Sequence, residues 1–72
     1  MTYGERAVGL SFNPSANPDV DRVKRLYAEI IDLCNEARGD DRSERARLFS
    51  VAITEAQTAQ MWAVKALTFA SD

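Results

Sequence analysis

The sequence predicts an all-α protein: an antiparallel helical hairpin that follows an N-terminal arm and assembles as a homo-oligomer. Apolar residues recur at steps of three and four over two segments, about 18–38 and 43–70, and the polar segment between them suits a turn. The length of 72 residues limits the chain to one domain with a marginal core, which favours association between copies. We therefore expect an arm at 1–16 and a hairpin at 17–72 within a single domain.

The first long helix has clear start and stop signals. Asn17 can cap its free N–H groups, Pro18 has the φ angle of a first helical turn, and Asp19 complements the helix dipole. An apolar stripe then leads to Arg38, after which Gly39 is a typical stop. The stripe consists of Val20, Val23, Leu26, Tyr27, Ile30, Ile31, Leu33, Cys34 and Ala37.

The second helix follows a cap at Ser43 or Asp41 and contains no Gly or Pro. Small residues at alternating steps of four and three form an Ala-rich seam, which lets another helix approach closely. The seam consists of Ala52, Ala56, Ala59, Ala63, Ala66 and Ala70. A second stripe lies beside it and consists of Phe49, Ile53, Gln60, Met61, Val64 and Leu67. One partner helix cannot cover both stripes, and this helix, at roughly 40 Å, exceeds the first, at roughly 30 Å. Further copies are therefore expected to pack on it.

The N-terminal arm has no sustained period, and it is expected to be extended or to form a short helix. Val8, Leu10 and Phe12 alternate as they would in an extended segment. Together with Tyr3 they give the arm more large apolar side chains than a disordered tail usually carries. We expect the arm to pack on something, such as a neighbouring subunit.

Composition argues against most catalytic and metal chemistry. The chain has no histidine and one cysteine, Cys34, which lies on an apolar helix face and is interpreted as a small buried hydrophobe. No phosphate-binding glycine loop is present, so we expect no enzyme activity, no cofactor and no metal. The net charge of −2 and pI of about 5.0 argue against duplex nucleic acid and membranes as partners. Without a signal peptide or a membrane-length apolar run, a cytoplasmic location is expected.

A binding site is a better prospect at the start of the first helix. Lys24 and Arg25 lie in its opening turns, and Phe12 precedes them on a proline-stiffened segment. Asn13 and Ser15 add short hydrogen-bonding groups. An aromatic ring, polar side chains and cations suit a nucleotide, but the same residues also suit a hydrophobic staple around a helix cap.

A polar ridge on the second helix allows two interpretations. It consists of Arg47, Ser50, Thr54, Gln57, Thr58 and Lys65, and several members are three or four residues apart, hence on one face. Its hydroxyl groups could form hydrogen bonds between helices, or could line a polar pocket in a symmetric interface.

Two segments, FNPSANPDVDRVKRLYAEIIDL at 12–33 and TEAQTAQMWAVKALT at 54–68, resemble the Acb2/Tad1 hairpin family of phage proteins. The resemblance implies a small helical hairpin that assembles as a homohexamer and acts as a sponge. Such proteins sequester cyclic dinucleotides, such as 3',3'-cGAMP, or cyclic trinucleotides without cleaving them, which silences bacterial CBASS defence. Some members act on Thoeris signals.

The resemblance also implies roles for individual residues. Phe12 is similar to an aromatic residue that stacks on a base, although relatives with tyrosine have a hydroxyl that it lacks. Lys24, in Val23-Lys24, resembles a lysine that meets a phosphate. Arg47 resembles an arginine upstream of a similar Thr-acid-x-Gln-Thr run, whose threonines are Thr54 and Thr58 here.

The sequence thus predicts a sponge for cyclic oligonucleotides that acts in the host cytoplasm if a phage encodes it. The alternative is a structural helical module that binds a protein partner through its Ala-rich seam. A nucleotide-degrading enzyme is a third possibility, which would require turnover.

Overall fold

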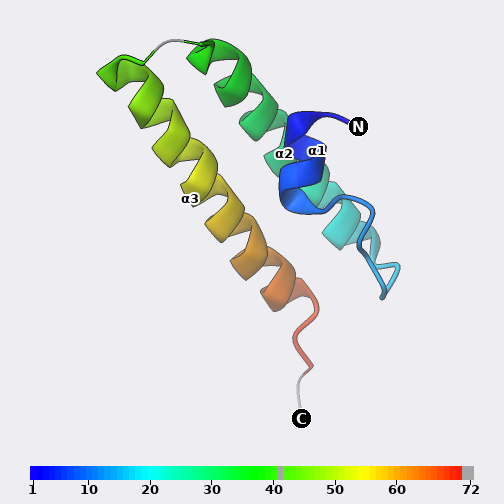
Figure 1. The fold of residues 1–72 in the computed structure, drawn as a ribbon. Helices are drawn as coiled ribbons and strands as arrows, with labels where there is room; N and C mark the ends of the chain where they lie inside the picture. Colours follow the sequence, from blue (N-terminus) through cyan, green and yellow to red (C-terminus); the bar gives the residue numbers. More distant parts are fainter. Residues whose placement is uncertain (41, 71–72) are drawn as a thin grey trace.

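The structure is a computed structural model that describes residues 1–40 and 42–70. It has three helices in these residues: α1 (Tyr3–Val8), α2 (Pro18–Arg38) and α3 (Glu44–Leu67). Helices α2 and α3 run antiparallel and side by side, and α1 packs mainly on α2 (Figure 1). The molecule is elongated, with extents of 48 × 24 × 13 Å. The predicted all-α hairpin is confirmed.

Helix α2 begins and ends with the predicted caps. Oδ1 of Asn17 accepts hydrogen bonds from the backbone N–H groups of Asp19, at 2.8 Å, and Val20, at 3.3 Å. These bonds satisfy two amides that have no partner within the helix. At the other end, Gly39 has a φ of 59°, a left-handed angle that glycine adopts without steric cost.

Helix α3 is shorter than predicted at its C-terminal end. Ser43 is its N-cap and accepts a hydrogen bond from the N–H of Ala46 at 3.2 Å; the other candidate, Asp41, lies outside the described residues. The sequence pattern extends to residue 70, but the helix ends at Leu67. Thr68 is the C-cap, and its N–H donates to the carbonyl of Val64 at 3.0 Å.

The arm begins with a short helix, one of the two forms expected for it. Thr2 and Glu5 form a capping box, in which the Thr2 hydroxyl accepts from the Glu5 N–H and the Glu5 carboxylate accepts from the Thr2 N–H. Gly9, with a φ of 63°, ends the helix. The alternation of Val8, Leu10 and Phe12 therefore does not mark an extended strand.

Helix α1 packs on its own chain, at a point where a glycine permits close approach. The N–H of Gly4 donates to Oδ1 of Asp32 at 2.7 Å. A Cβ atom at Gly4 would lie 2.1 Å from the carbonyl oxygen of Ala28, so no larger residue fits without moving α1. As expected, the arm packs on another segment, and that segment is α2. This contact determines where the rest of the arm lies.

A small core joins the three helices. Ile31 is fully buried, and Val8, Ala28 and Ile53 complete the cluster around it. Cys34 is partly buried against this cluster. Burial of a side chain such as Ile31 stabilises the fold by about 1.5–3 kcal/mol, so few such residues give a modest core.

Much of the apolar surface remains uncovered in the single chain. Ile53 and Gln60 of the second α3 stripe are buried beside α2, whereas Ala52, Ala59 and Ala66 of the Ala-rich seam are exposed. Exposed large apolar side chains elsewhere include Leu26, Ile30, Leu33, Leu48, Val51, Met61, Trp62 and Phe69. As expected from the two stripes, α2 alone does not cover the apolar residues of α3.

Candidate functional site

Four of the residues predicted to bind ligand lie together beside the start of α2. Phe12, Asn13, Ser15 and Lys24 line one cavity of about 240 Å³, which we call the arm hollow. Its other lining residues are Pro14, Val20, Val64 and Thr68. The last two come from the C-terminal end of α3, which lies beside the arm because the hairpin is antiparallel (Figure 1).

Lys24 is buried, with 4% of its surface exposed, and its amine holds the arm in place. Nζ donates to the carbonyl oxygen of Gly9 at 2.9 Å and also to that of Phe12. It lies 5.6 Å from the centre of the Phe12 ring, within cation–π range. A lysine ammonium has three donors, so these carbonyls leave one N–H for a ligand.

Asn13 and Ser15 shape the loop that leads into α2. Nδ2 of Asn13 donates to the carbonyl of Asn17 at 2.9 Å, and the Ser15 hydroxyl donates to Oδ1 of Asn13 at 3.2 Å. Ala16 follows with a φ of 52°, an uncommon angle for a residue with a side chain. Asn13 and Ser15, which were predicted to bind a ligand, thus also order the loop before the cap of α2.

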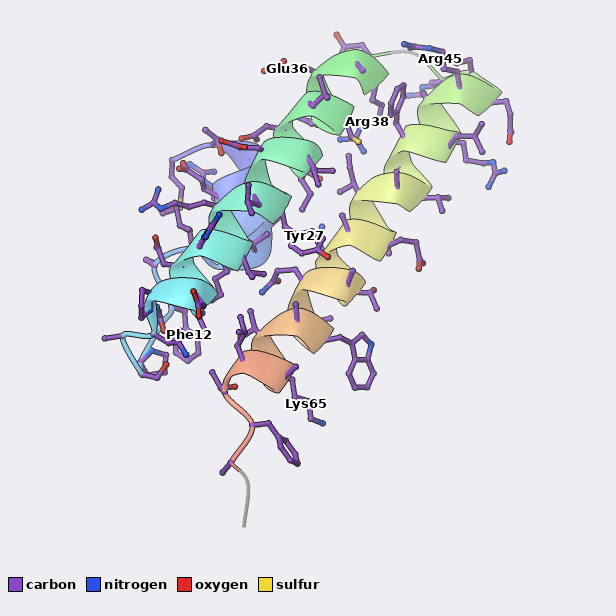
Figure 2. All side chains as sticks on the ribbon, turned by 180° about the vertical axis from the view of Figure 1, so that it is seen from behind. Phe12, Tyr27, Glu36, Arg38, Arg45 and Lys65 are labelled. Carbon is purple, nitrogen blue, oxygen red and sulfur yellow. The ribbon has the colours of Figure 1, made fainter. Side chains whose placement is uncertain are left out.

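A second and larger cavity, of about 590 Å³, adjoins the arm hollow and shares Lys24, Val64 and Thr68 with it. We call it the cationic groove, since its charged lining residues are cations: Arg6, Lys24 and Lys65. The other residues that line it are Ala7, Val8, Gly9, Gln57, Gln60 and Met61. Figure 2 shows Phe12 and Lys65 at the same end of the hairpin, opposite the end that carries Glu36 and Arg45.

Arg25 is placed away from both cavities. It lines a small hollow with Glu5, Glu29 and Asp32, and its Nε donates to Oδ2 of Asp21 at 2.8 Å. The hydrogen bond and charge of Asp21 raise the pKa of Arg25. Within a single chain, Arg25 therefore does not join Lys24, because adjacent positions on a helix point about 100° apart.

Arg47 and Thr54 are also remote from the arm hollow within one chain. Arg47 lies in the first turn of α3 and its Nε donates to Glu44 at 3.0 Å, which lowers the pKa of the Glu44 carboxyl. From Arg47 to Val64, which lines the hollow, the helix rises by about 25 Å. A site that combined Arg47 with Lys24 would have to take them from different copies of the chain.

The hydroxyl row of α3 bonds to its own helix. Ser50, Thr54 and Thr58 each donate to the carbonyl four residues earlier at 3.2 Å. Ser50 also accepts from Arg38 of α2 at 3.1 Å, which joins the two helices. Thr58 lines a shallow hollow with Met61, Trp62 and Lys65. Each hydroxyl oxygen keeps a lone pair that can accept from a ligand or another copy.

Sequence reasoning did not select several residues of the cationic groove. Arg6 belongs to the arm, and Gln57 and Lys65 belong to the polar ridge, but none of the three is among the residues predicted to bind ligand. Gln60 was grouped with the apolar stripe, although an amide in such a stripe is itself a signal. The capping box at Thr2 and Glu5 could have located α1 and hence Arg6.

The described residues, 1–40 and 42–70, contain no group of three or more His, Cys, Asp or Glu side chains placed to hold a metal ion. Nor is any helix among them long and apolar enough to span a membrane.

Comparison with known families places the chain. Residues 5–68 match the family described as Acb2/Tad1, hairpin domain. The match covers most of the sequence, including all of α2 and α3, so this protein belongs to the Acb2/Tad1 hairpin family. Searches of curated proteins and of solved structures gave no significant match. At the level of the family, membership suggests a cyclic-oligonucleotide sponge, and such sponges are generally non-catalytic.

Proposed function

We propose that this protein is a non-catalytic sponge that binds cyclic di- or trinucleotide second messengers and thereby blocks CBASS signalling in the host cytoplasm. The observation that carries the proposal is the pair of adjoining cavities at the open end of the hairpin. Arg6, Lys24 and Lys65 line them, and none of the described residues in the two linings is acidic, although the chain as a whole has a net charge of −2. Cations gathered around a cavity favour a phosphate-bearing ligand.

The arm hollow supplies the second feature that a nucleotide needs. Phe12 is 72% exposed, so one face of its ring is available to stack on a base, while its carbonyl is held by Lys24. Base stacking on an aromatic side chain is worth about 1–3 kcal/mol. Because the arm is already fixed by Lys24, the ring would lose little freedom on binding, which favours affinity.

The proposal includes association of identical chains. Leu26, Ile30 and Leu33 form an exposed stripe on α2, and Met61 and Trp62 are exposed on α3. Contiguous apolar surface of this kind marks an interaction site. Association between copies, as a hexamer in the form that the resemblance implies, would also bring Arg25, Arg47, Thr54 and Thr58 of one chain toward the cavities of another.

Calorimetric titration of the purified protein with a panel of cyclic di- and trinucleotides tests the proposal. We expect saturable binding of at least one member, and chromatography of the heated complex should return that ligand intact. A cleaved product would show an enzyme instead, and absence of binding across the panel would refute sequestration of these messengers. Thoeris signals form a second panel for the same measurement.

The exposed stripes also support a second candidate, a helical module that binds a different protein. Trp62 on α3 is a residue type that often dominates binding at interfaces. Mass measurement separates the two functions, because a sponge built from several copies has a mass of two or more times 8.0 kDa. A single-chain mass at micromolar concentration would favour the partner-binding module.

A further inference from the structure

Gln60 occupies a position at which the fold does not need an amide. It lies on the face of α3 that packs against α2, seven residues after the core residue Ile53, and only 5% of its surface is exposed. An apolar side chain would pack equally well there. Buried polar side chains in proteins are normally paired with a partner that accounts for them.

Within residues 1–40 and 42–70, the Gln60 side chain makes no hydrogen bond. No fully enclosed side-chain nitrogen or oxygen of the described residues lacks a partner. The amide atoms of Gln60 are therefore the part of the residue that reaches the cationic groove, which Gln60 lines. The stem is covered by protein, and the polar tip is presented to whatever enters the groove.

The surroundings of the amide suit a charged ligand of nucleotide size. Arg6, Lys24 and Lys65 line the same groove, and its volume of about 590 Å³ lies within the range of small-molecule sites. Where the cations contact phosphate groups, those contacts do not distinguish one base from another. The amide is the group in the groove that is nearly buried and still unpaired, so it is the group best placed to read a base.

We propose that Gln60 is the specificity-determining residue of the cationic groove and that it reads adenine along the N6/N7 edge of that base; this rests on the proposed sponge function. A primary amide carries a donor beside an acceptor. Adenine presents the complement along one edge, because its N6 amine donates and its N7 accepts. Guanine presents two acceptors, O6 and N7, on the same edge, so one of them would face the amide oxygen of Gln60.

The test compares two cyclic dinucleotides of equal charge and ring size, one with two adenines and the other with two guanines. Wild type and Gln60→Leu are titrated with each by calorimetry. We expect the substitution to weaken adenine dinucleotide binding about ten-fold or more, the effect typical of losing a bidentate base contact. Affinity for the guanine dinucleotide should change by less than about three-fold, because the phosphate contacts of the cations are intact.

Thermal unfolding and mass of Gln60→Leu separate this role from a structural one. We expect a melting temperature equal to or above that of wild type, because an apolar side chain replaces an unpaired amide, and an unchanged mass. Equal changes for both ligands, or none, would overturn the base-reading role while wild-type binding upheld the sponge function. A changed mass with equal losses would assign the amide to a contact between copies and would also overturn it. If wild type bound neither of the two dinucleotides and no cyclic trinucleotide, both proposals would be overturned.

Discussion

Lys24 links the arm to α2 through charge and hydrogen bonds. A buried ammonium is costly unless it is paired, and here the carbonyls of Gly9 and Phe12 supply the pairing. The same amine lies at the boundary of the arm hollow and the cationic groove. In this structure Lys24 therefore orders the residues around the site, and in the proposed function it also contacts a phosphate.

Lys24→Ala is expected to weaken ligand binding strongly while leaving the oligomer intact. The substitution removes a cation from both cavities and leaves two carbonyls without their donor, which costs about 1–3 kcal/mol of stability for each buried unsatisfied group. Calorimetry gives the affinity, light scattering the mass and thermal unfolding the stability. Arg22→Ala, which removes an exposed cation of α2 that lines neither cavity, is the matched control. Unchanged affinity in Lys24→Ala would remove this residue from the site.

The Glu44–Arg47 pair offers a pH-dependent readout of Arg47. Its hydrogen bond lowers the pKa of Glu44 from the usual value of about 4.5, so the pair contributes stability above that pH. The contribution is lost as the pH falls through the lowered pKa, and it is small because both side chains are exposed. Arg47→Gln should raise the pKa of Glu44 toward its usual value, measured by NMR titration of its carboxyl carbon.

A ligand that recruits Arg47 should have the same effect on Glu44 as the substitution does. We expect the Glu44 pKa to rise when the wild-type protein is saturated with a bound cyclic oligonucleotide. No change on saturation would mean that Arg47 stays on Glu44 and does not contribute to binding.

Helix α1 approaches the backbone of α2 closely at Gly4, so its place depends on one small residue. Gly4→Ala would put a Cβ 2.1 Å from the Ala28 carbonyl and would push α1 away from α2. We expect a loss of about 1–3 kcal/mol of stability, as for other overpacked sites, and weaker ligand binding because Arg6 moves with α1. Hydrogen exchange at the amide that donates to Asp32 should accelerate.

Tyr3→Phe is the control for this helix, because Tyr3 is exposed, lines neither cavity and the change adds no atom near α2. Hydrogen exchange at the amide of residue 4 that stayed as slow in Gly4→Ala as in wild type would show that α1 can keep its place without the close approach.

The single chain has a small core and leaves many large apolar side chains exposed. We expect several copies of the protein to associate in solution, with a total mass of two or more times 8.0 kDa. Ile30→Glu should lower that mass, because Ile30 lies mid-stripe between Leu26 and Leu33 on α2 and a buried, unpaired charge disfavours an interface. Light scattering at micromolar concentration measures both proteins.

Glu36→Gln, a neutral change at an exposed site on the same helix, is the control for this experiment. A wild-type mass of 8.0 kDa would contradict self-association altogether. A multimer that Ile30→Glu did not disturb would instead place the interface elsewhere, with the exposed residues of α3 as the next candidates.

Local signals sufficed for the long helices and for one end of the site. The cap at Asn17, the stop at Gly39 and the apolar period each involve residues within about four positions of one another, and the sequence displays such relations directly. The grouping of Phe12, Asn13, Ser15 and Lys24 could be predicted for the same reason, since they are close in the chain.

The cationic groove could be identified only from the three-dimensional structure. Arg6 and Lys65 are far apart in sequence and meet only because α1 packs on α2 while α3 returns antiparallel beside it. The same packing places Arg25 among carboxylates, and it buries Gln60 without giving its amide a partner. Pairings of this kind depend on the rotation and register of packed helices, which sum many weak contacts across the chain, and no short stretch of residues specifies them.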